Sequence, residues 1–230
     1  MQSARRGLLV LSCAAVGLFL TGTVNRVRAA ALTPTDLNSF LAAVQSGNAE
    51  GVATTLQSFP ELARLKARNG LTMLHLAVGK GSTAMVVALI NAGADPNATG
   101  VRGATPLHLA AGGGMADMVA VLLAHKADVN LRDETGATPF HGAARAGDLK
   151  VVELILTAKG DVNALDTTGA TPLFYAIMAN RQVIVEKLVA SGADVNIKTK
   201  DGRTALDDAL KYNRAEIAQL LRDKGATSGG

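Results

Sequence analysis

Aromatic and sulfur-containing side chains are scarce in this sequence. Among its 230 residues there is no tryptophan, and there are two tyrosines, five phenylalanines and one cysteine, Cys13. Hydrophobic residues make up 48% of the chain but aromatic residues only 3%. The core must therefore be built mainly from alanine, leucine and valine, which suits thin layers of helices.

Recognisable catalytic motifs are also missing. The sequence has no Ser-His-Asp arrangement, no metal-ligand spacing and no phosphate-binding loop. The run Gly112-Gly113-Gly114 lacks the Lys-Ser or Lys-Thr that follows such a loop, so we interpret it as a turn. An enzyme is the least favoured interpretation, and we expect no catalytic residue, no metal and no cofactor.

What the sequence does contain is a regular repeat. The pattern Gly-x-Thr begins every 33 residues, at Gly70, Gly103, Gly136, Gly169 and Gly202. An apolar helical run follows each time, and four of the five units end in Asp-x-Asn. A fixed period of this size indicates stacked helical repeats, which are stabilised by contacts between neighbouring units.

The unit that begins at Gly103 shows what each position does. Thr105 is a good helix N-cap, and Pro106 falls at the first helical position, where its missing N–H costs nothing. A second helix is expected from the spacing of its apolar residues, which are Met115, Met118, Val119, Leu122 and Leu123. Asp128 and Asn130 are turn formers. We expect Leu122 to pack between units.

The unit resembles the ankyrin repeat. The resemblance is carried by Thr105-Pro106-Leu107-His108-Leu109-Ala110-Ala111 and by Ala127-Asp128-Val129-Asn130, with counterparts in the flanking units. It covers residues 70–230 strongly and residues 35–69 weakly. It implies an all-α ankyrin-repeat solenoid of helix-turn-helix units with protruding β-turn or hairpin tips, and a protein-binding role.

We divide the chain accordingly. Residues 1–31 are assigned to a signal segment and residues 32–69 to a degenerate N-terminal capping repeat. Four regular repeats are assigned to residues 70–102, 103–135, 136–168 and 169–201, and a C-terminal capping repeat to residues 202–230. In the N-terminal cap, Thr35 or Asp36 is expected to cap a first helix, and a second is expected over residues 49–58.

Three positions in the later units depart from the pattern. Gly142 replaces a leucine, and we expect it to leave a dent. Asp207 and Asp208 are expected to give the C-terminal unit a polar outer face. The end of the chain, residues 227–230, is expected to be frayed.

The ends of the second helices also vary. The family usually places a glycine there in a left-handed conformation, and Gly93 and Gly192 fit this expectation. Lys126 and Lys159 do not. Because a left-handed lysine costs about 1 kcal/mol, we expect these two turns to be rearranged or soft.

Residues 1–31 have the composition of an export signal. Arg5 and Arg6 make a basic start, residues 7–25 are uncharged, and small residues at 29–31 offer a cleavage site. We expect a secretory signal peptide and a mature chain that begins at Ala30 or Leu32. The arginine pair partly resembles a twin-arginine signal, with general secretion as the other route. An uncleaved signal anchor stays open, because the apolar stretch nearly spans a bilayer.

Removal of this segment would change the charge balance. The whole chain has 23 Lys and Arg against 19 Asp and Glu. The segment contains four arginines and no acidic residue, so the remainder carries 19 of each. Nucleic-acid binding requires a basic face, so we expect no nucleic-acid partner. Loss of Cys13 would also leave no thiol for disulfides or catalysis.

Three histidines, His75, His108 and His141, recur with the same period. Helices in a stack lie about 8–10 Å apart, whereas every ligand nitrogen of a metal ion lies within about 2.1 Å of it. The three rings therefore cannot share an ion. We expect them to bond to the threonine caps or to the backbone, and the resemblance implies the same structural role.

The resemblance places partner contacts on the tips and on the concave ends of the first helices. The tip positions singled out are Arg68, Arg102, Glu134, Thr168 and Lys200. The first-helix positions singled out are Lys80, Arg145, Tyr175, Met178 and Tyr212. An ordinary solvated surface is the alternative for each, and core filling is the alternative for Tyr175. Arg145, Met178 and Tyr212 are expected to form one strip across three repeats.

These observations predict a non-catalytic scaffold in the periplasm that binds or supports another exported protein. The alternative is a membrane-tethered structural or assembly factor that keeps its N-terminal helix. A membrane partner is expected only in that second case. The identity of the protein partner is not encoded in any motif that we recognise.

Overall fold

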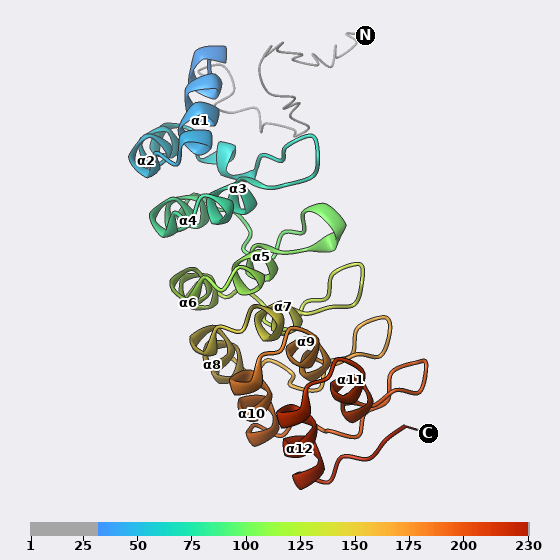
Figure 1. Cartoon of the computed structure of the whole chain (residues 1–230). Helices are drawn as coiled ribbons and strands as arrows, with labels where there is room; N and C mark the ends of the chain where they lie inside the picture. Colours follow the sequence, from blue (N-terminus) through green and yellow to red (C-terminus); the bar gives the residue numbers. More distant parts are fainter. Residues whose placement is uncertain (1–31, 230) are drawn as a thin grey trace, which may run out of the picture.

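The computed structural model describes residues 32–229 and shows a curved stack of helix pairs with turns projecting along one side (Figure 1). This part of the chain forms twelve α-helices and two short 3-10 helices, and its only β-type pairing is an isolated bridge between Lys66 and Thr72. The predicted all-α solenoid is confirmed.

Each unit contributes one helix to each of two layers. The first helices, next to the tips in Figure 1, are α1 (Pro34–Ser46), α3 (Met73–Gly79), α5 (Pro106–Gly112), α7 (Pro139–Ala146), α9 (Pro172–Met178) and α11 (Ala205–Lys211). The second helices are α2 (Ala49–Ser58), α4 (Thr83–Asn91), α6 (Ala116–Ala124), α8 (Leu149–Thr157), α10 (Gln182–Ala190) and α12 (Ala215–Asp223). The 3-10 helices are η1 (Pro60–Arg64) and η2 (Val101–Gly103).

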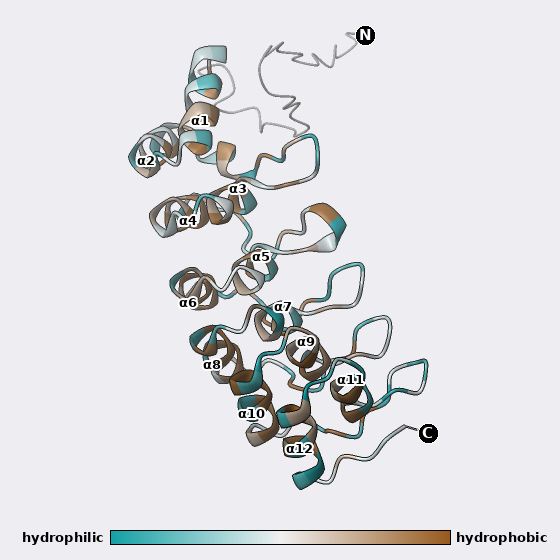
Figure 2. Ribbon diagram, viewed as in Figure 1, coloured by the Kyte–Doolittle hydropathy of each residue, from teal (hydrophilic) through white to brown (hydrophobic). Residues whose placement is uncertain are grey.

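Apolar residues fill the space between neighbouring units. One continuous core extends from Phe40 in α1 to Ala226 after α12, and Leu122 within it is 0% exposed, as predicted. Figure 2 shows hydrophobic residues concentrated on the helices and more hydrophilic residues on the tips. Because every layer is thin, stability depends on contacts between units.

The start of α1 differs from the prediction. Thr33, and not Thr35 or Asp36, is the N-cap. The Thr33 hydroxyl accepts from the Asp36 amide at 3.2 Å, and the Asp36 carboxylate accepts from the Thr33 amide at 2.9 Å. This reciprocal capping box satisfies two backbone donors, whereas a cap at Thr35 would satisfy one. The second helix of this unit is Ala49–Ser58, as predicted.

The recurring glycine of each unit lies in a tip. Gly136 has a φ of 75°, and its amide donates to the Asp133 carbonyl at 2.9 Å, which closes a β-turn. A Cβ at Gly136 would lie 2.9 Å from the Thr167 amide nitrogen of the next tip. Glycine is thus required both by the left-handed backbone and by the close approach. The predicted β-turn tips are confirmed.

The Asp-x-Asn segments link consecutive units. Asn130 accepts from the Asp161 amide at 2.9 Å and donates to the Lys159 carbonyl at 3.2 Å. The same pair of bonds is made by Asn97, Asn163 and Asn196. One side chain thereby satisfies two backbone groups of the following unit, which explains why it recurs.

These asparagines also explain how Lys126 and Lys159 are tolerated. Both lysines keep the left-handed backbone, with φ values of 65° and 62°, so the predicted rearrangement of their turns is wrong. Their carbonyls accept from Asn97 at 3.3 Å and from Asn130 at 3.2 Å. In each turn the asparagine of the preceding unit holds the left-handed backbone by a hydrogen bond, although lysine is unfavourable in that conformation.

The dent expected at Gly142 is also absent. A Cβ there would lie 3.2 Å from both the Cα and the amide nitrogen of Gly112. The missing side chain instead permits close packing of α7 against α5.

The C-terminal unit departs from the prediction in two ways. Residues 227–229 are docked rather than frayed, because Thr227 donates from its amide to Asn196 at 2.9 Å and Gly229 donates to Asp207 at 2.8 Å. Asp207 and Asp208 do not form a solvent-facing surface: Asp207 also accepts from the Thr204 amide at 2.8 Å, and Asp208 is only 1% exposed. Both carboxylates are used inside the unit.

Candidate functional site: a groove on the last three units

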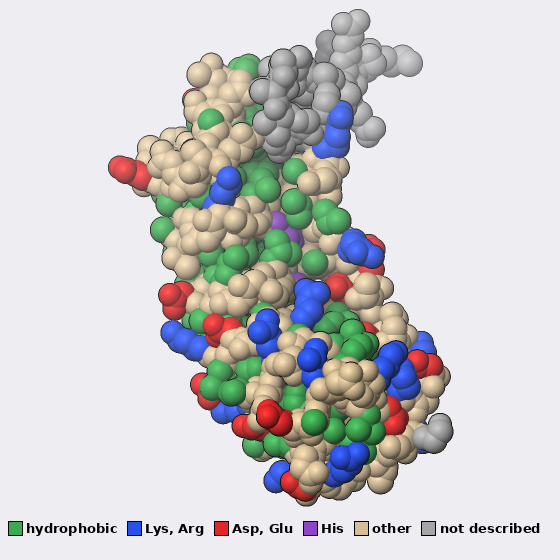
Figure 3. Space-filling view, viewed as in Figure 1, with side chains coloured by type: hydrophobic (Ala, Val, Ile, Leu, Met, Phe, Trp, Pro, Cys, Tyr) green, Lys and Arg blue, Asp and Glu red, His purple; other side chains and the backbone are tan. Residues whose placement is uncertain are grey.

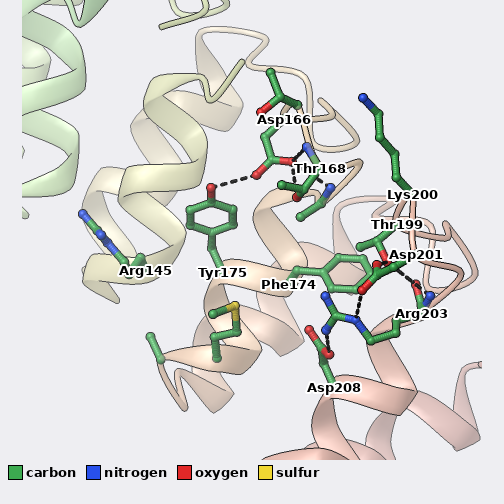
Figure 4. A pocket seen from close by; sticks show the side chains of 14 residues that line it. Arg145, Asp166, Thr168, Phe174, Tyr175, Thr199, Lys200, Asp201, Arg203 and Asp208 are labelled. Carbon is green, nitrogen blue, oxygen red and sulfur yellow. Dashed lines mark hydrogen bonds and ion pairs between the residues drawn. The ribbon is translucent and has the colours of Figure 1, made fainter. Parts of the chain in front are cut away.

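A groove of about 830 Å³ lies between the first helices and the tips of the last three units. Its lining comes from α7, α9 and α11 and from the two tips between them (Figure 4). It brings together five of the ten residues singled out from the sequence, namely Arg145, Thr168, Tyr175, Met178 and Lys200.

Tyr175 forms the centre of one wall. Its hydroxyl donates to Oδ2 of Asp166 at 2.9 Å, and its ring meets the His141 ring edge-on with 5.0 Å between centroids. Burial, together with the Asp166 hydrogen bond and charge, raises the pKa of Tyr175 to about 12. The side chain is half-buried, so it both supports the stack and faces the groove.

Asp166 is committed to the tip that it begins. Its Oδ1 accepts from the Thr168 amide at 2.8 Å, the Thr168 hydroxyl at 2.6 Å and the Ala170 amide at 3.0 Å. Burial acts to raise the pKa of Asp166, but these hydrogen bonds and that of Tyr175 outweigh it and lower the pKa. Thr168, singled out as a contact residue, thus has a structural task.

Arg203 occupies the opposite wall between two carboxylates. It donates from Nε to Asp201 at 2.7 Å and forms an ion pair with the buried Asp208 (Figure 4). Hydrogen bonds from Thr199 and Arg203 lower the pKa of Asp201 to about 2. The hydrogen bond to Asp201 in turn raises the pKa of Arg203.

The two other cations of the lining, Arg145 and Lys200, are placed differently. Both are exposed, and neither forms an ion pair within residues 32–229. They lie on opposite sides of the groove, with Tyr175 and Phe174 between them (Figure 4). Met178 is 51% exposed in the same lining. The site therefore offers an accessible apolar floor with an unpaired cation at each side.

The family model described as ankyrin repeats (3 copies) matches residues 39–133, 74–166 and 140–228. The chain belongs to the ankyrin-repeat family. The resemblance drawn from the sequence is confirmed, and the chain is a protein-interaction scaffold in the sense common to ankyrin repeats. No curated protein matches the sequence significantly.

The other five singled-out residues lie outside the groove of this ankyrin array. Arg68, Arg102 and Glu134 are exposed on earlier tips, and Lys80 is exposed at the end of α3. Tyr212 is half-buried after α11, with Lys211 Nζ 5.7 Å from its ring centroid.

The expected strip of Arg145, Met178 and Tyr212 is therefore wrong in its last member. Arg145 and Met178 line the groove and Tyr212 does not. The 33-residue period explains this, because the equivalent of Met178 in the last unit is Lys211.

Sequence analysis missed Phe174 and Arg203 as groove residues, although both break the repeat. Phe174 replaces the recurring histidine, and Arg203 replaces an alanine found at the same position in three earlier units. A large apolar side chain at the histidine position and a charged side chain at the alanine position were the signals that could have identified the site.

The three histidines have the expected structural role. His75, His108 and His141 each bond through Nδ1 to the threonine cap, and through Nε2 to the Ala104, Ala137 and Ala170 carbonyls at 2.9, 3.0 and 3.2 Å. Burial lowers the pKa of each ring. Residues 32–229 contain no cluster of side chains able to hold a metal ion.

Phe174 breaks this series of bonds. The Thr171 hydroxyl beside it is buried and has no hydrogen-bond partner, whereas the equivalent Thr105 bonds to His108 at 2.8 Å. The phenylalanine instead adds an apolar ring to the groove lining. The last regular unit has thus exchanged a structural hydrogen bond for an apolar ring packed at the base of the groove.

Proposed function

We propose that this ankyrin array is a non-catalytic scaffold that binds another exported protein through the groove on its last three units. The observation that carries the proposal is the contrast between the charged groups of the lining. Asp166, Asp201 and Asp208 are all engaged by groups of the chain itself, whereas Arg145 and Lys200 are unpaired within the described residues.

The exposed apolar floor supports the same proposal. Met178 and the accessible part of Tyr175 lie between the two cations. Arginine and tyrosine are enriched among residues that dominate binding energies, and methionine adapts readily to a partner surface. The remaining half of the array carries glycine at the positions equivalent to Arg145 and Met178, which are Gly79 and Gly112.

Affinity capture from the source organism tests the proposal. The full chain serves as bait, next to a groove variant (Arg145→Ala, Met178→Ala, Lys200→Ala) and a matched control on other exposed surfaces (Arg222→Ala, Val183→Ala, Lys224→Ala). Loss of an interface anchor costs about 2 kcal/mol or more, or about 30-fold in affinity.

We expect the groove variant to lose the protein that the control retains. Exposed substitutions change stability by less than about 0.5 kcal/mol, so both variants should melt like the parent. Equal capture by the two variants would place the binding surface elsewhere on the array.

We also propose that residues 1–31 direct export and are removed. These residues lie outside the described part of the chain, and the proposal is supported by the arginine pair, the uncharged stretch and the small residues after it. No helix within residues 32–229 is both long and apolar enough for a membrane span. Mass spectrometry of the protein from its source should give an N-terminus at Ala30 or Leu32. Intact Met1 in the membrane fraction would support the tethered alternative.

A further inference from the structure

We infer that the groove selects an acidic partner segment, in which an apolar side chain is flanked by carboxylates. The inference rests on the proposed function and adds the chemistry of the partner.

The carboxylates of the lining are already engaged by groups of the chain itself. Asp166 accepts three hydrogen bonds from its own tip and one from Tyr175. Asp201 and Asp208 share Arg203. Arg203 offsets one of the two charges of this pair, and Asp166, whose donors are all neutral, keeps its own. Each of the three carboxylates nevertheless already accepts hydrogen bonds from groups of the chain itself.

The lining of the groove holds three cations and three carboxylates, and two of the cations form no ion pair within the described residues. Arg145 and Lys200 are exposed on opposite sides of it. A further cation reinforces one side, because Arg181 packs over Gly147 and donates from Nε to the Arg145 carbonyl at 3.1 Å. Figure 3 shows Lys and Arg side chains, with Asp and Glu side chains among them, on the visible face of the lower half of the array.

The partner segment must also place an apolar side chain between its two anionic side chains. Phe174 is buried at the base of the lining, and Met178 and Tyr175 present accessible apolar surface above it. Covering this surface removes it from water, whereas a uniformly charged segment would leave it wet or lose its own hydration. A leucine-like side chain between two acidic residues satisfies both parts of the groove.

A nucleic acid fits this surface less well. Residues 32–229 carry 19 basic and 19 acidic side chains, since the segment before them contains four of the 23 basic ones. Nucleic-acid affinity comes mainly from many phosphate contacts along a basic stripe, and here only Arg145, Lys200 and the adjacent Arg181 are available. An acidic protein segment needs two such contacts.

Selection of displayed peptides against the immobilised full chain tests the inference. We expect a random twelve-residue library to yield peptides with Asp or Glu on both sides of an apolar residue. A fluorescein-labelled selected peptide is then titrated against the parent, against Arg145→Glu/Lys200→Glu, and against the control Arg222→Glu/Lys224→Glu, whose basic side chains are exposed outside the groove.

We expect the groove reversal to weaken peptide binding at least tenfold and the control to change it less than twofold. A peptide with lysines in place of its acidic residues should bind the reversed groove better than the parent. Circular dichroism melting shows that each variant is folded.

Other outcomes separate the two proposals. Selected peptides that lack acidic residues, or whose binding ignores the groove reversal, would overturn the acidic segment but leave a protein-binding scaffold. Recovery of no peptide, with no protein captured by the parent, would contradict both proposals. Binding of a single-stranded oligonucleotide that depends on Arg145 and Lys200 would overturn the choice of a protein partner.

Discussion

The Tyr175 hydroxyl donates a hydrogen bond of 2.9 Å to Oδ2 of Asp166, nine residues earlier in the chain. Asp166 begins a tip, and Tyr175 lies on α9, the helix that follows it. The bond therefore fixes the tip to the helix on one wall of the groove. It also occupies one oxygen of the carboxylate on that wall.

The ionisation of Tyr175 should report this bond. Its pKa is raised to about 12, above the ordinary value of 10.0. Because the folded pKa is the higher one, the stabilisation is complete below pH 10 and is lost as the pH rises toward 12. Absorbance at 295 nm in Tyr212→Phe isolates Tyr175, since the chain has two tyrosines. Titration near pH 10 with unchanged circular dichroism would contradict the bond.

The buried hydroxyl of Thr171 should be dispensable. Thr171 and Thr105 are each 1% exposed, but only Thr105 bonds to a histidine. Valine keeps the shape of threonine, so Thr171→Val removes an unsatisfied polar group and should leave stability unchanged or raise it. Thr105→Val should cost about 1 kcal/mol through loss of the cap. Denaturant unfolding that gave equal losses would show that Thr171 has a partner.

Leu122 should be essential to the stack. It is 0% exposed, whereas Leu210 at the end of the array is 44% exposed. Leu122→Ala should lower the free energy of unfolding by about 2–5 kcal/mol, because it removes buried surface and leaves a cavity. Leu210→Ala is the control, with an expected loss well below that range. Similar melting of the two variants would refute the packing described for α6.

Lys126 should be a point of stored strain. Its φ is 65°, whereas Lys224, at the end of α12, has a φ of −97°. A left-handed lysine costs about 1–2 kcal/mol. Glycine removes this cost, but its greater freedom in the unfolded chain cancels part of the gain in stability. Lys126→Gly should therefore stabilise the fold by about 0.5–1 kcal/mol in denaturant unfolding, and Lys224→Gly should not. A loss in Lys126→Gly would mean that the lysine side chain stabilises the turn.

The sequence was sufficient for those features that depend on the repeat. The 33-residue period predicts the helix pairs, the tips and the structural histidines, because each follows from one local pattern that every unit shares. The capping box of Thr33 escaped prediction because Thr35 and Asp36, two other capping residues, lie within three positions of it. The Thr33-Pro34 pair, which matches Thr105-Pro106, was the local signal for the correct cap.

The groove was less predictable because it arises where units differ. Its lining depends on Phe174 in place of histidine and on Arg203 in place of alanine, and on hydrogen bonds from Tyr175 and Arg203 to carboxylates in neighbouring segments. The docked tail was missed because its sequence also differs from that of the earlier units. Thr227 takes the place of an aspartate, and its bond to Asn196 depends on the backbone path and not on the residue type.

The most direct test of the central claim is photo-crosslinking from inside the groove. A photoreactive phenylalanine analogue is placed at Met178 in the full chain and, as a control, at Val183, which is 58% exposed on α10 outside the groove. After irradiation in cells of the source organism, the account predicts one discrete protein adduct from position 178, absent from position 183 and abolished by Arg145→Glu/Lys200→Glu. An adduct from position 183 only would contradict the claim that this groove binds the partner, and one from position 178 that persists in the charge-reversed variant would contradict the role of Arg145 and Lys200 in that binding.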